Sequence, residues 1–248
     1  MKAMILAAGM GTRLKPLTDT TPKALIPVNG KPMLEHLILK LKKAGFHEII
    51  INIHHLGEQI TGFLHTNNNF GLTIYISDER KYLMDTGGAI KQAAGFLLQG
   101  NEPILVHNAD ILSDVDLTAF SLSHKGNNAL ATLLVSKRNA SRSLLFDKEN
   151  KLCGWRNRET GEVKSHIPDF DPLQYNEYAF GGVHILSPEI FSRMEEWTGK
   201  FSIINFYLSV CIKANIQAYP ADKLTLIDIG KPESLAEAER FLKQKQGE

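Results

Sequence analysis

The stretch between residues 6 and 23, LAAGMGTRLKPLTDTTPK, places glycines, one arginine and lysines directly behind the first apolar run of the chain. Gly9 and Gly11 allow backbone N–H groups to approach an anion closely, and Arg13 and Lys23 add positive charge beside them. The planar guanidinium of arginine suits phosphate oxygens. These residue types at this spacing predict a loop that binds phosphate. A structural glycine turn with a solvated arginine is the alternative that these residues alone leave open.

Two common phosphate-binding motifs do not describe this loop. The pattern G-x-x-x-x-G-K-[ST] is absent, and the pattern G-x-G-x-x-G fails because Leu14 stands at its third glycine. The next apolar stretch, EIIINI, ends without an acidic residue that would hold a ribose. His54 and His55, which follow it, form no joint metal site, because neighbours in a strand point to opposite faces. We expect a core or loop-end role for both histidines.

Two carboxylates lie in apolar stretches that read as strands. Asp110 closes PILVHNAD, and Asp228 lies within LTLIDIG. Magnesium prefers oxygen ligands and needs only one or two protein carboxylates beside substrate phosphates. Both aspartates face one crevice if their strands are neighbours, although a strand-end aspartate is also a common turn former or helix cap. Asp114 and Asp116 are predicted as a turn residue and a helix cap, with Asp114 near enough to support the metal ligands.

Apolar strands that alternate with helical patterns must position these side chains. Leucine and isoleucine recur at helical spacing in residues 31–44, and a second helix is expected at about 88–98. Continuous apolar strands separated by helices indicate an α/β fold with a mostly parallel, Rossmann-like sheet that is covered on both faces. The expected strands are residues 4–6, 48–53, 71–77, 103–110 and 129–136.

This rhythm breaks between about residues 143 and 178, where the chain is polar and irregular and DKEN marks a hairpin turn. A strand then resumes at AFGGVHILS, and helices are expected near 188–197 and 203–214. Pro232 opens an amphipathic terminal helix. No internal repeat or low-complexity linker is present in the sequence. We therefore expect one domain, residues 1–248, with a substrate-binding insertion.

The composition excludes several other classes of protein. The 248 residues carry 28 lysines and arginines against 27 aspartates and glutamates, so no global basic field predicts nucleic-acid binding. No apolar run approaches the ~20 residues of a membrane span, and MKAMILAAG is expected to be a buried strand, not a signal peptide. Cys153 and Cys211 are expected as buried thiols in a reducing compartment. We expect a cytoplasmic monomer or small homo-oligomer.

The whole loop, L-A-A-G-x-G-T-R-L followed by P-K-A-L-I-P-V, resembles the signature of the sugar-1-phosphate nucleotidyltransferases. Four further segments resemble motifs of that family in the same order along nearly the full chain. They are DTGGAI at 85–90, NAD at 108–110, AFGGVHIL at 179–186 and IDIGKPESLAEAERFL at 227–242. The resemblance implies the nucleotide-diphospho-sugar transferase type of fold and a reaction in which NTP and sugar-1-phosphate give NDP-sugar and pyrophosphate with Mg²⁺.

The resemblance also implies a division of the single domain. Residues 1–140 would form the nucleotide-binding part, residues 141–226 a small mixed sugar-side elaboration, and residues 227–248 the metal-bearing strand end and closing helix. Arg13 would hold the β- and γ-phosphates, and Lys23 the α-phosphate or the sugar phosphate. Asp110 and Asp228 would hold Mg²⁺. The residues implied to bind the nucleotide are Leu6, Ala8, Gly9, Gly11, Thr12, Arg13, Asp85, Thr86, Gly87 and Gly88.

The sugar site departs from the family pattern. Many relatives carry an E-K-P segment that contacts the sugar, but this chain reads GWRNRETGEVK in the corresponding region. Gly182 matches a glycine of the sugar-side strand, and Glu177 and Asn205 are predicted partners of sugar hydroxyls. Asp85 stands where the compact uridylyl enzymes usually have glutamate, and its shorter reach puts a base contact there in doubt. Gly87 and Gly88 would let a base lie against the backbone.

The compact length is similar to that of the N-acetylmuramate-1-phosphate uridylyltransferases, so UTP and N-acetylmuramate-1-phosphate are the expected substrates. Arg142, Arg156 and Arg158 are candidate partners for the lactyl carboxylate. A mannose-1-phosphate guanylyltransferase is the first alternative, and a non-catalytic nucleotide-binding module is the last. Between them stands an enzyme like the phosphocholine cytidylyltransferases, which would need an aromatic box for the cationic head group. Its candidate residues are Trp155, Tyr175, Tyr178 and Phe180.

Overall fold

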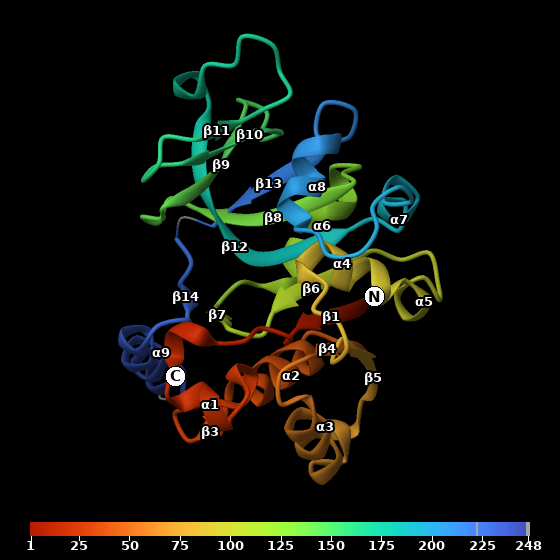
Figure 1. Ribbon diagram of the computed structural model, residues 1–248, viewed down its shortest axis with the longest axis vertical. Helices are drawn as coiled ribbons and strands as arrows, with labels where there is room; N and C mark the ends of the chain where they lie inside the picture. Colours follow the sequence, from red (N-terminus) through yellow and green to blue (C-terminus); the bar gives the residue numbers. More distant parts are fainter. Residues whose placement is uncertain (222, 247–248) are drawn as a thin grey trace.

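The computed structural model describes residues 1–221 and 223–246. Residue 222, and residues 247 and 248 at the end of the predicted closing part, lie outside the described residues. The described chain folds around one ten-stranded sheet with helices on both faces (Figure 1). The predicted α/β class is therefore confirmed.

Four neighbouring parallel strands form the first half of the sheet. In their order across the sheet they are β6 (Ile104–Asn108), β1 (Lys2–Leu6), β4 (Glu48–Ile53) and β5 (Thr73–Asp78). The register pairs Met4 with both Ile50 and Val106. Because successive side chains point to opposite faces, Met4 belongs to one hydrophobic core and Ile5 to the other. The predicted parallel sheet is present in these strands.

Helices cover both faces of these strands. The face of Ile5 carries α2 (Met33–Lys43) and α3 (Gly57–Thr66), and the face of Met4 carries α4 (Asp85–Gln92) and α5 (Ala94–Leu97). α2 confirms the helix predicted from periodicity, because Leu34, Leu37, Ile38 and Leu41 are all buried. The helix predicted at 88–98 begins earlier, at Asp85, and Ala93 separates it into two parts.

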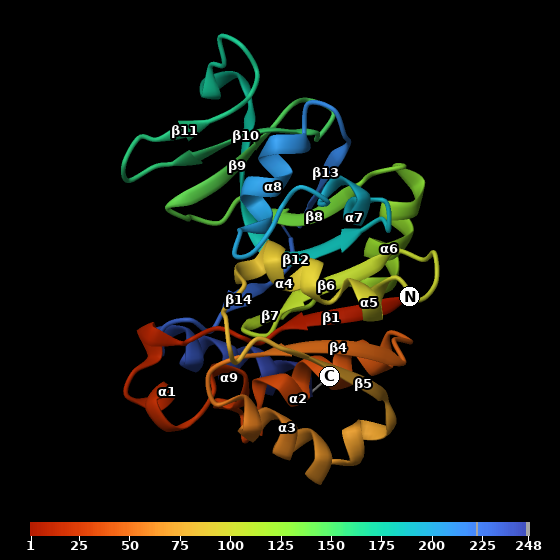
Figure 2. The same cartoon turned by 45° about the vertical axis from the view of Figure 1, so that its right-hand side comes forward.

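The second half of the sheet is mixed. β12 (Asn176–Leu186) pairs antiparallel with β6, and it also pairs antiparallel with β8 (Ala131–Ser136) and β9 (Arg142–Phe146). The expected hairpin at DKEN is present, because β9 pairs with β10 (Leu152–Asn157). These strands lie above the parallel half in Figure 2. The remaining elements of this region are β11 (Val163–Lys164), η4 (Pro172–Gln174), α7 (Ile190–Arg193), α8 (Ile203–Val210) and β13 (Ile216–Pro220).

A separate two-stranded sheet brings the late strand to the first half of the chain. β14 (Leu226–Asp228) pairs antiparallel with β7 (Ile111–Ser113), and the register places Asp228 opposite Ile111. The late strand therefore does not join the main sheet, yet it lies next to Asp110. The helix predicted after this strand is α9 (Pro232–Gln246), whose Ala238 is fully buried against Val28 and Met33. The remaining short elements are η1 (Thr12–Leu14), α1 (Leu17–Thr20), η2 (Lys23–Leu25), β2 (Pro27–Val28), β3 (Lys31–Pro32), η3 (Asn68–Gly71) and α6 (Leu117–Gly126).

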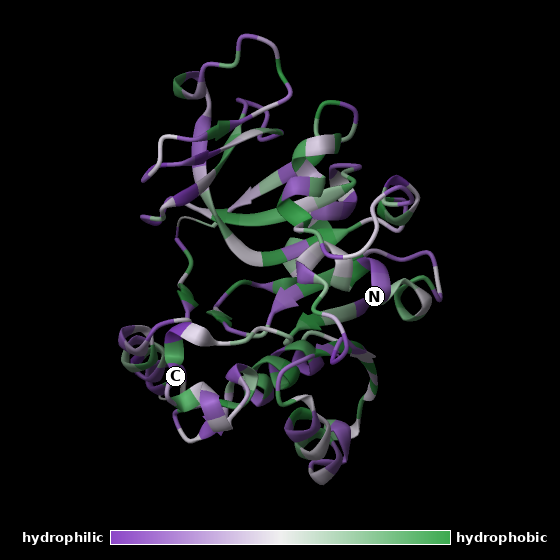
Figure 3. Cartoon of the chain, viewed as in Figure 1, coloured by the Kyte–Doolittle hydropathy of each residue, from purple (hydrophilic) through white to green (hydrophobic). Residues whose placement is uncertain are grey.

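Figure 3 shows hydrophobic residues along the central strands and α2, whereas the outer loops and α9 are largely hydrophilic. None of the helices in the described part of the chain is long and apolar enough to span a bilayer. Cys153 and Cys211 are both free thiols, and burial raises the pKa of Cys153 to about 11. Asp116 is the helix cap that was predicted, because its side chain accepts hydrogen bonds from the backbone of Thr118 and Ala119.

Buried histidines should make this fold sensitive to mild acid. Burial lowers the pKa of His107 and of His184 to about 3, and that of His124 to about 4. Since an unfolded histidine has a pKa of about 6.5, only the unfolded chain takes up protons as the pH falls below that value. We expect the free energy of unfolding to drop by about 2 kcal/mol for each fully buried histidine between about pH 6.5 and 5. Urea unfolding at both pH values measures this, and an unchanged midpoint would contradict it.

Candidate active site

The loop after β1 is open at Gly9 and is fastened further along the chain, at Gly11 and Leu14. Gly11 has a positive φ of 64°, and a Cβ there would lie 2.6 Å from Thr18 Cγ2. Thr18 Oγ1 also donates a hydrogen bond of 2.8 Å to Gly11 O, and Leu14 is buried. No atom lies within 4 Å of the Cβ position of Gly9. The first glycine therefore faces open space, as a loop that wraps a ligand requires.

Arg13 lies where the loop meets the end of β14. Its Nη2 atom is 3.9 Å from Asp228 Oδ2, and its side chain is 59% exposed. Gly230 makes this approach possible, because a Cβ at that position would overlap Arg13 Nη2. The Gly230 N–H donates a hydrogen bond of 2.7 Å to Asp228 Oδ1 and so fixes that carboxylate. Gly230 was not singled out from the sequence, although the IDIG stretch contains it.

Lys23 connects the two aspartates. Its ammonium donates a hydrogen bond to Asp110 Oδ2 and lies 3.9 Å from Asp228 Oδ1. Its side chain is only 11% exposed. Pro22 precedes it in an extended conformation and sets the direction in which the chain enters η2. Four of the predicted residues, Arg13, Lys23, Asp110 and Asp228, therefore form one cluster of alternating charge.

The two carboxylates fit a magnesium ion. Because one ammonium reaches both of them, Asp110 and Asp228 lie close enough to share a cation. Their side chains remain 25% and 36% exposed, so substrate and water oxygens can reach the same place. No group of three or more acidic, histidine or cysteine side chains suited to a metal occurs among the described residues. Magnesium needs only one or two protein carboxylates, so this donor set is sufficient.

A cavity of about 370 Å³, here called the loop cavity, opens beside this cluster. It lies at the carboxyl ends of β1 and β6, where ligands bind in open α/β sheets. Gly11, Thr12 and Arg13 lie outside its lining, and Arg13 lies near Asp228 instead. Of the predicted residues it is lined by Leu6, Ala8, Gly9, Asp85, Thr86 and Asp110, and it is also lined by Asn52, Glu79, Leu83, Asn108 and Lys200.

Asn52 and Glu79 are polar, nearly inaccessible and missed by the sequence analysis. Asn52 Oδ1 accepts a hydrogen bond of 2.6 Å from Ala7 N, and Asn52 Nδ2 donates one of 2.7 Å to Glu79 Oε1. Glu79 Oε2 accepts a third from Met84 N at 3.0 Å. The pair therefore connects the loop after β1 to the N-terminus of α4. An asparagine inside the apolar stretch EIIINI was the signal that could have revealed it.

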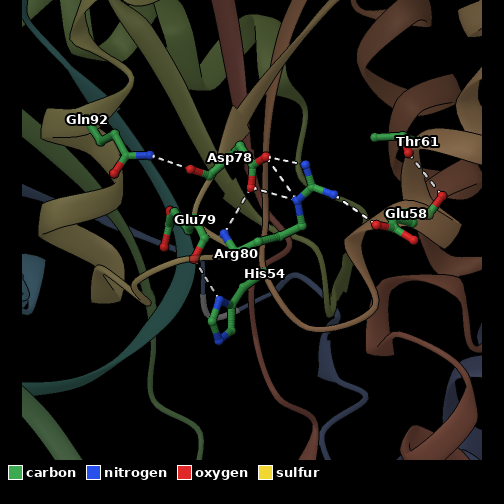
Figure 4. A network of polar contacts seen from close by, with 7 residues as sticks. All are labelled: His54, Glu58, Thr61, Asp78, Glu79, Arg80 and Gln92. Atoms are coloured by element: carbon green, nitrogen blue, oxygen red, sulfur yellow. Dashed lines mark hydrogen bonds and ion pairs between the residues drawn. The ribbon is translucent and has the colours of Figure 1, made fainter.

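Figure 4 shows how the loop between β5 and α4 is fastened from outside. His54 Nδ1 donates a hydrogen bond of 2.7 Å to Glu79 O. Arg80 binds Asp78 through Nε and Nη2 and reaches Glu58 Oε1 through Nη1 at 3.1 Å. The hydrogen bond from Arg80 lowers the pKa of the Asp78 carboxyl. His54 thus has the predicted loop-end role, and the network holds Glu79 in place.

Gly87 and Gly88 pack against the segment around residue 200. Their N–H groups donate hydrogen bonds of 2.9 and 3.2 Å to Phe201 O. A Cβ on Gly87 would overlap the Phe201 ring, and one on Gly88 would lie 2.5 Å from Gly199 O. These glycines therefore permit close packing of the segment around residue 200.

A second cavity of about 590 Å³, here called the hairpin cavity, lies between the β9–β10 hairpin and α8. Asp85 lines both this cavity and the loop cavity. The predicted sugar residue Asn205 lines the hairpin cavity. Arg138, Arg142 and Lys164 contribute its cationic side chains.

The other predicted sugar residues lie outside this lining. Glu177 binds Arg158 at 2.7 Å, and that hydrogen bond lowers its pKa. Gly182 has a positive φ of 72°, and a Cβ there would lie 2.8 Å from Ile111 Cγ1 and 2.9 Å from Asn108 Nδ2. Gly182 therefore allows β12 to pack closely beside Asn108 and Ile111, which flank Asp110 in the sequence. Neither residue is brought to the hairpin cavity.

Comparison with known proteins gives this site a context. The N-acetylmuramate alpha-1-phosphate uridylyltransferase of Neisseria meningitidis serogroup B is 50% identical over 119 residues, which cover 48% of this chain and 51% of that protein. The chain thus matches about half the length of that relative. The enzyme of the same name from Caulobacter vibrioides is 29% identical over 248 residues, covering 97% and 96% of the two chains.

The fold has close counterparts among solved structures. A putative glucose-1-phosphate thymidylyltransferase from Bacillus anthracis superposes with a TM-score of 0.79 over 97% of this chain and 94% of that one, at 23% identity. That likeness concerns the fold alone. The family profile described as Nucleotidyl transferase matches residues 2–245, almost the whole sequence. The chain therefore belongs to the nucleotidyl transferase family.

Proposed function

We propose that the protein transfers a nucleotidyl group from an NTP to a sugar-1-phosphate, with release of pyrophosphate. The observation that carries this proposal is the cluster of Arg13, Lys23, Asp110 and Asp228 at the mouth of the loop cavity. The charges of the cluster alternate. The loop cavity adjoins the hairpin cavity, because Asp85 lines both. Such an arrangement suits two phosphate-bearing substrates that must meet.

The chemistry makes few demands on protein side chains. The nucleophile is an oxygen of a phosphate monoester, which is largely dianionic near neutral pH, since its second pKa is about 6. No general base is required. His107 in β6 and His184 in β12 are buried, and their lowered pKa values keep both imidazoles neutral near neutral pH. Mg²⁺ bound by Asp110 and Asp228 would supply positive charge to the phosphates.

The two cations of the cluster have separable roles in this proposal. The exposed guanidinium of Arg13 holds the β- and γ-phosphates and stabilises the charge that develops on the departing pyrophosphate. The ammonium of Lys23 is nearly buried between the carboxylates and holds the α-phosphate. Leu6, Ala8, Gly9, Asp85 and Thr86 would contact the nucleoside along the wall of the loop cavity.

UTP and N-acetylmuramate-1-phosphate are the proposed substrates. The names of the Neisseria and Caulobacter relatives support this choice. The hairpin cavity supports it independently, because Arg142 lines that cavity and its side chain has no hydrogen-bond or ion-pair partner within the described chain. A lactyl carboxylate would supply that partner, whereas Arg158 is already bound to Glu177. A neutral hexose such as mannose would offer Arg142 hydroxyl groups but no anionic partner.

The cytidylyl alternative finds less support. Trp155 and Phe180 line the hairpin cavity, but Tyr175 and Tyr178 do not. Arg138, Arg142 and Lys164 outnumber the carboxylates of Asp85 and Glu162 in the same lining, so its net positive charge disfavours a quaternary ammonium group.

A pyrophosphate-release screen over four NTPs and a panel of sugar phosphates tests the proposal. We expect turnover, with a higher kcat/KM for UTP and N-acetylmuramate-1-phosphate than for GTP and mannose-1-phosphate. A site with buried polar partners can reject a mismatched substrate by up to ~10⁴-fold. A ratio below one would overturn the choice of substrates and leave nucleotidyl transfer standing. Absence of turnover with every pair would overturn the function itself.

A further inference from the structure

The lining of the loop cavity contains three carboxylates, on Glu79, Asp85 and Asp110, and a single cationic side chain, that of Lys200. Glu79 accepts hydrogen bonds from Asn52 and Met84, and Asp110 accepts one from Lys23. Lys200 forms no hydrogen bond or ion pair with any residue that the structure describes. Because the Lys200 ammonium makes no ion pair in the described chain, it can bind an anionic ligand that enters the cavity.

The backbone that follows Lys200 is fastened to α4. Phe201 N donates to Met84 O at 3.2 Å, and Phe201 O accepts from Gly87 and Gly88. Two residues later, Ile203 N donates to Thr86 Oγ1 at 3.0 Å. Because both glycines lack the Cβ that would collide with this segment, the helix and the segment lie in direct contact. The position of Lys200 is therefore fixed relative to Asp85 and Thr86.

The side chain of Lys91 holds the part of the chain that precedes this segment. The ammonium of Lys91, on α4, donates hydrogen bonds to the carbonyl oxygens of Met194, Glu195 and Trp197 at 2.8, 2.9 and 2.6 Å. One side chain thus satisfies three carbonyls that follow α7 and precede Lys200. The chain is fixed before and after Lys200, while the Lys200 side chain itself stays exposed.

The segment also connects the two cavities. Lys200 lines the loop cavity, whereas Ser202, Ile204 and Asn205 line the hairpin cavity. Asp85, which lies beside the segment, lines both. Because Asp85 borders both cavities, a phosphate that joins a nucleoside in one cavity to a sugar in the other would lie near this segment.

We propose that Lys200 binds the phosphate of the sugar-1-phosphate and holds its oxygen for attack on the α-phosphorus. This role rests on the proposed nucleotidyl transfer and supplies a cation that the missing E-K-P segment does not. In the step, the sugar-phosphate oxygen forms a bond to the α-phosphorus while the bond to the pyrophosphate oxygen breaks. The Lys200 ammonium stays protonated throughout and bonds the resulting diphosphate of the NDP-sugar.

Kinetics of Lys200→Met and Lys200→Arg test this assignment, with Lys213→Met as a matched control on an exposed lysine in the turn after α8 that lines neither cavity. A hydrogen bond to a charged group contributes about 1.5–3 kcal/mol, which corresponds to about 10- to 100-fold in affinity. We expect Lys200→Met to lose that factor in kcat/KM for the sugar-1-phosphate, and Lys200→Arg to recover part of it. The control should match the wild type.

Binding measured by calorimetry separates this role from a general structural one. Lys200→Met should bind the NDP-sugar about tenfold or more weakly and the nucleoside monophosphate within about twofold of the wild type. Equal losses for both ligands, or an unchanged kcat/KM in an active enzyme, would overturn the assignment and leave nucleotidyl transfer intact. A wild type that turns over no NTP and sugar-1-phosphate pair would overturn the proposed function and the role of Lys200 with it.

Discussion

Replacement of Asp110 or of Asp228 by asparagine is expected to leave the fold intact and to remove most of the turnover. Each change keeps the shape of the side chain but removes the charge that a shared cation requires, and loss of such electrostatic stabilisation typically costs about 10²- to 10³-fold in kcat. Both side chains remain partly exposed, so the substitutions should cost little stability. Initial rates across a magnesium titration and thermal unfolding by circular dichroism measure the two effects.

Asp116→Asn is the matched control for these variants. Asp116 caps α6, and asparagine caps a helix about as well as aspartate does. We expect this variant to keep both stability and turnover. Full activity in Asp110→Asn or in Asp228→Asn would remove that aspartate from the metal site.

Arg13→Ala is expected to lower kcat by about 10²-fold or more, because removal of one group that stabilises developing charge typically costs about 3 kcal/mol. The NDP-sugar lacks the pyrophosphate that Arg13 is proposed to hold, so its affinity should change much less. Lys15→Ala is the control, since Lys15 is an exposed loop cation paired with Asp19. If affinity for the NDP-sugar collapses while kcat holds, Arg13 contacts the sugar side instead.

The elements that local pattern determines could be predicted from the sequence. The strand EIIINI and the helix α2 follow from apolar periodicity, and both are present with the expected buried faces. The glycine-rich loop was also predictable in part, because Gly11 adopts the positive φ that favours glycine. Because the loop follows a buried parallel strand, the sequence also predicted that a ligand would bind at the carboxyl end of that strand.

Features that depend on contacts between distant segments were not predictable in the same way. The pairing of β14 with β7, which brings Asp228 beside Asp110, depends on long-range register that no local period encodes. Gly87 and Gly88 are positions of close approach, as the sequence suggested, but the Phe201 ring and the Gly199 carbonyl that approach them could not be foreseen. Lys200 lies on an irregular segment and gains its position only from the packing of that segment on α4.

The central claim is nucleotidyl transfer at the cluster of Arg13, Lys23, Asp110 and Asp228. Phosphorus NMR of the protein with magnesium, UTP and N-acetylmuramate-1-phosphate tests it most directly. The claim predicts resonances of a new sugar diphosphate and of pyrophosphate, which grow in equal amounts and do not form when a chelator is present from the start. Release of orthophosphate without a sugar diphosphate, or equal yields from the Asp110→Asn variant, would contradict it.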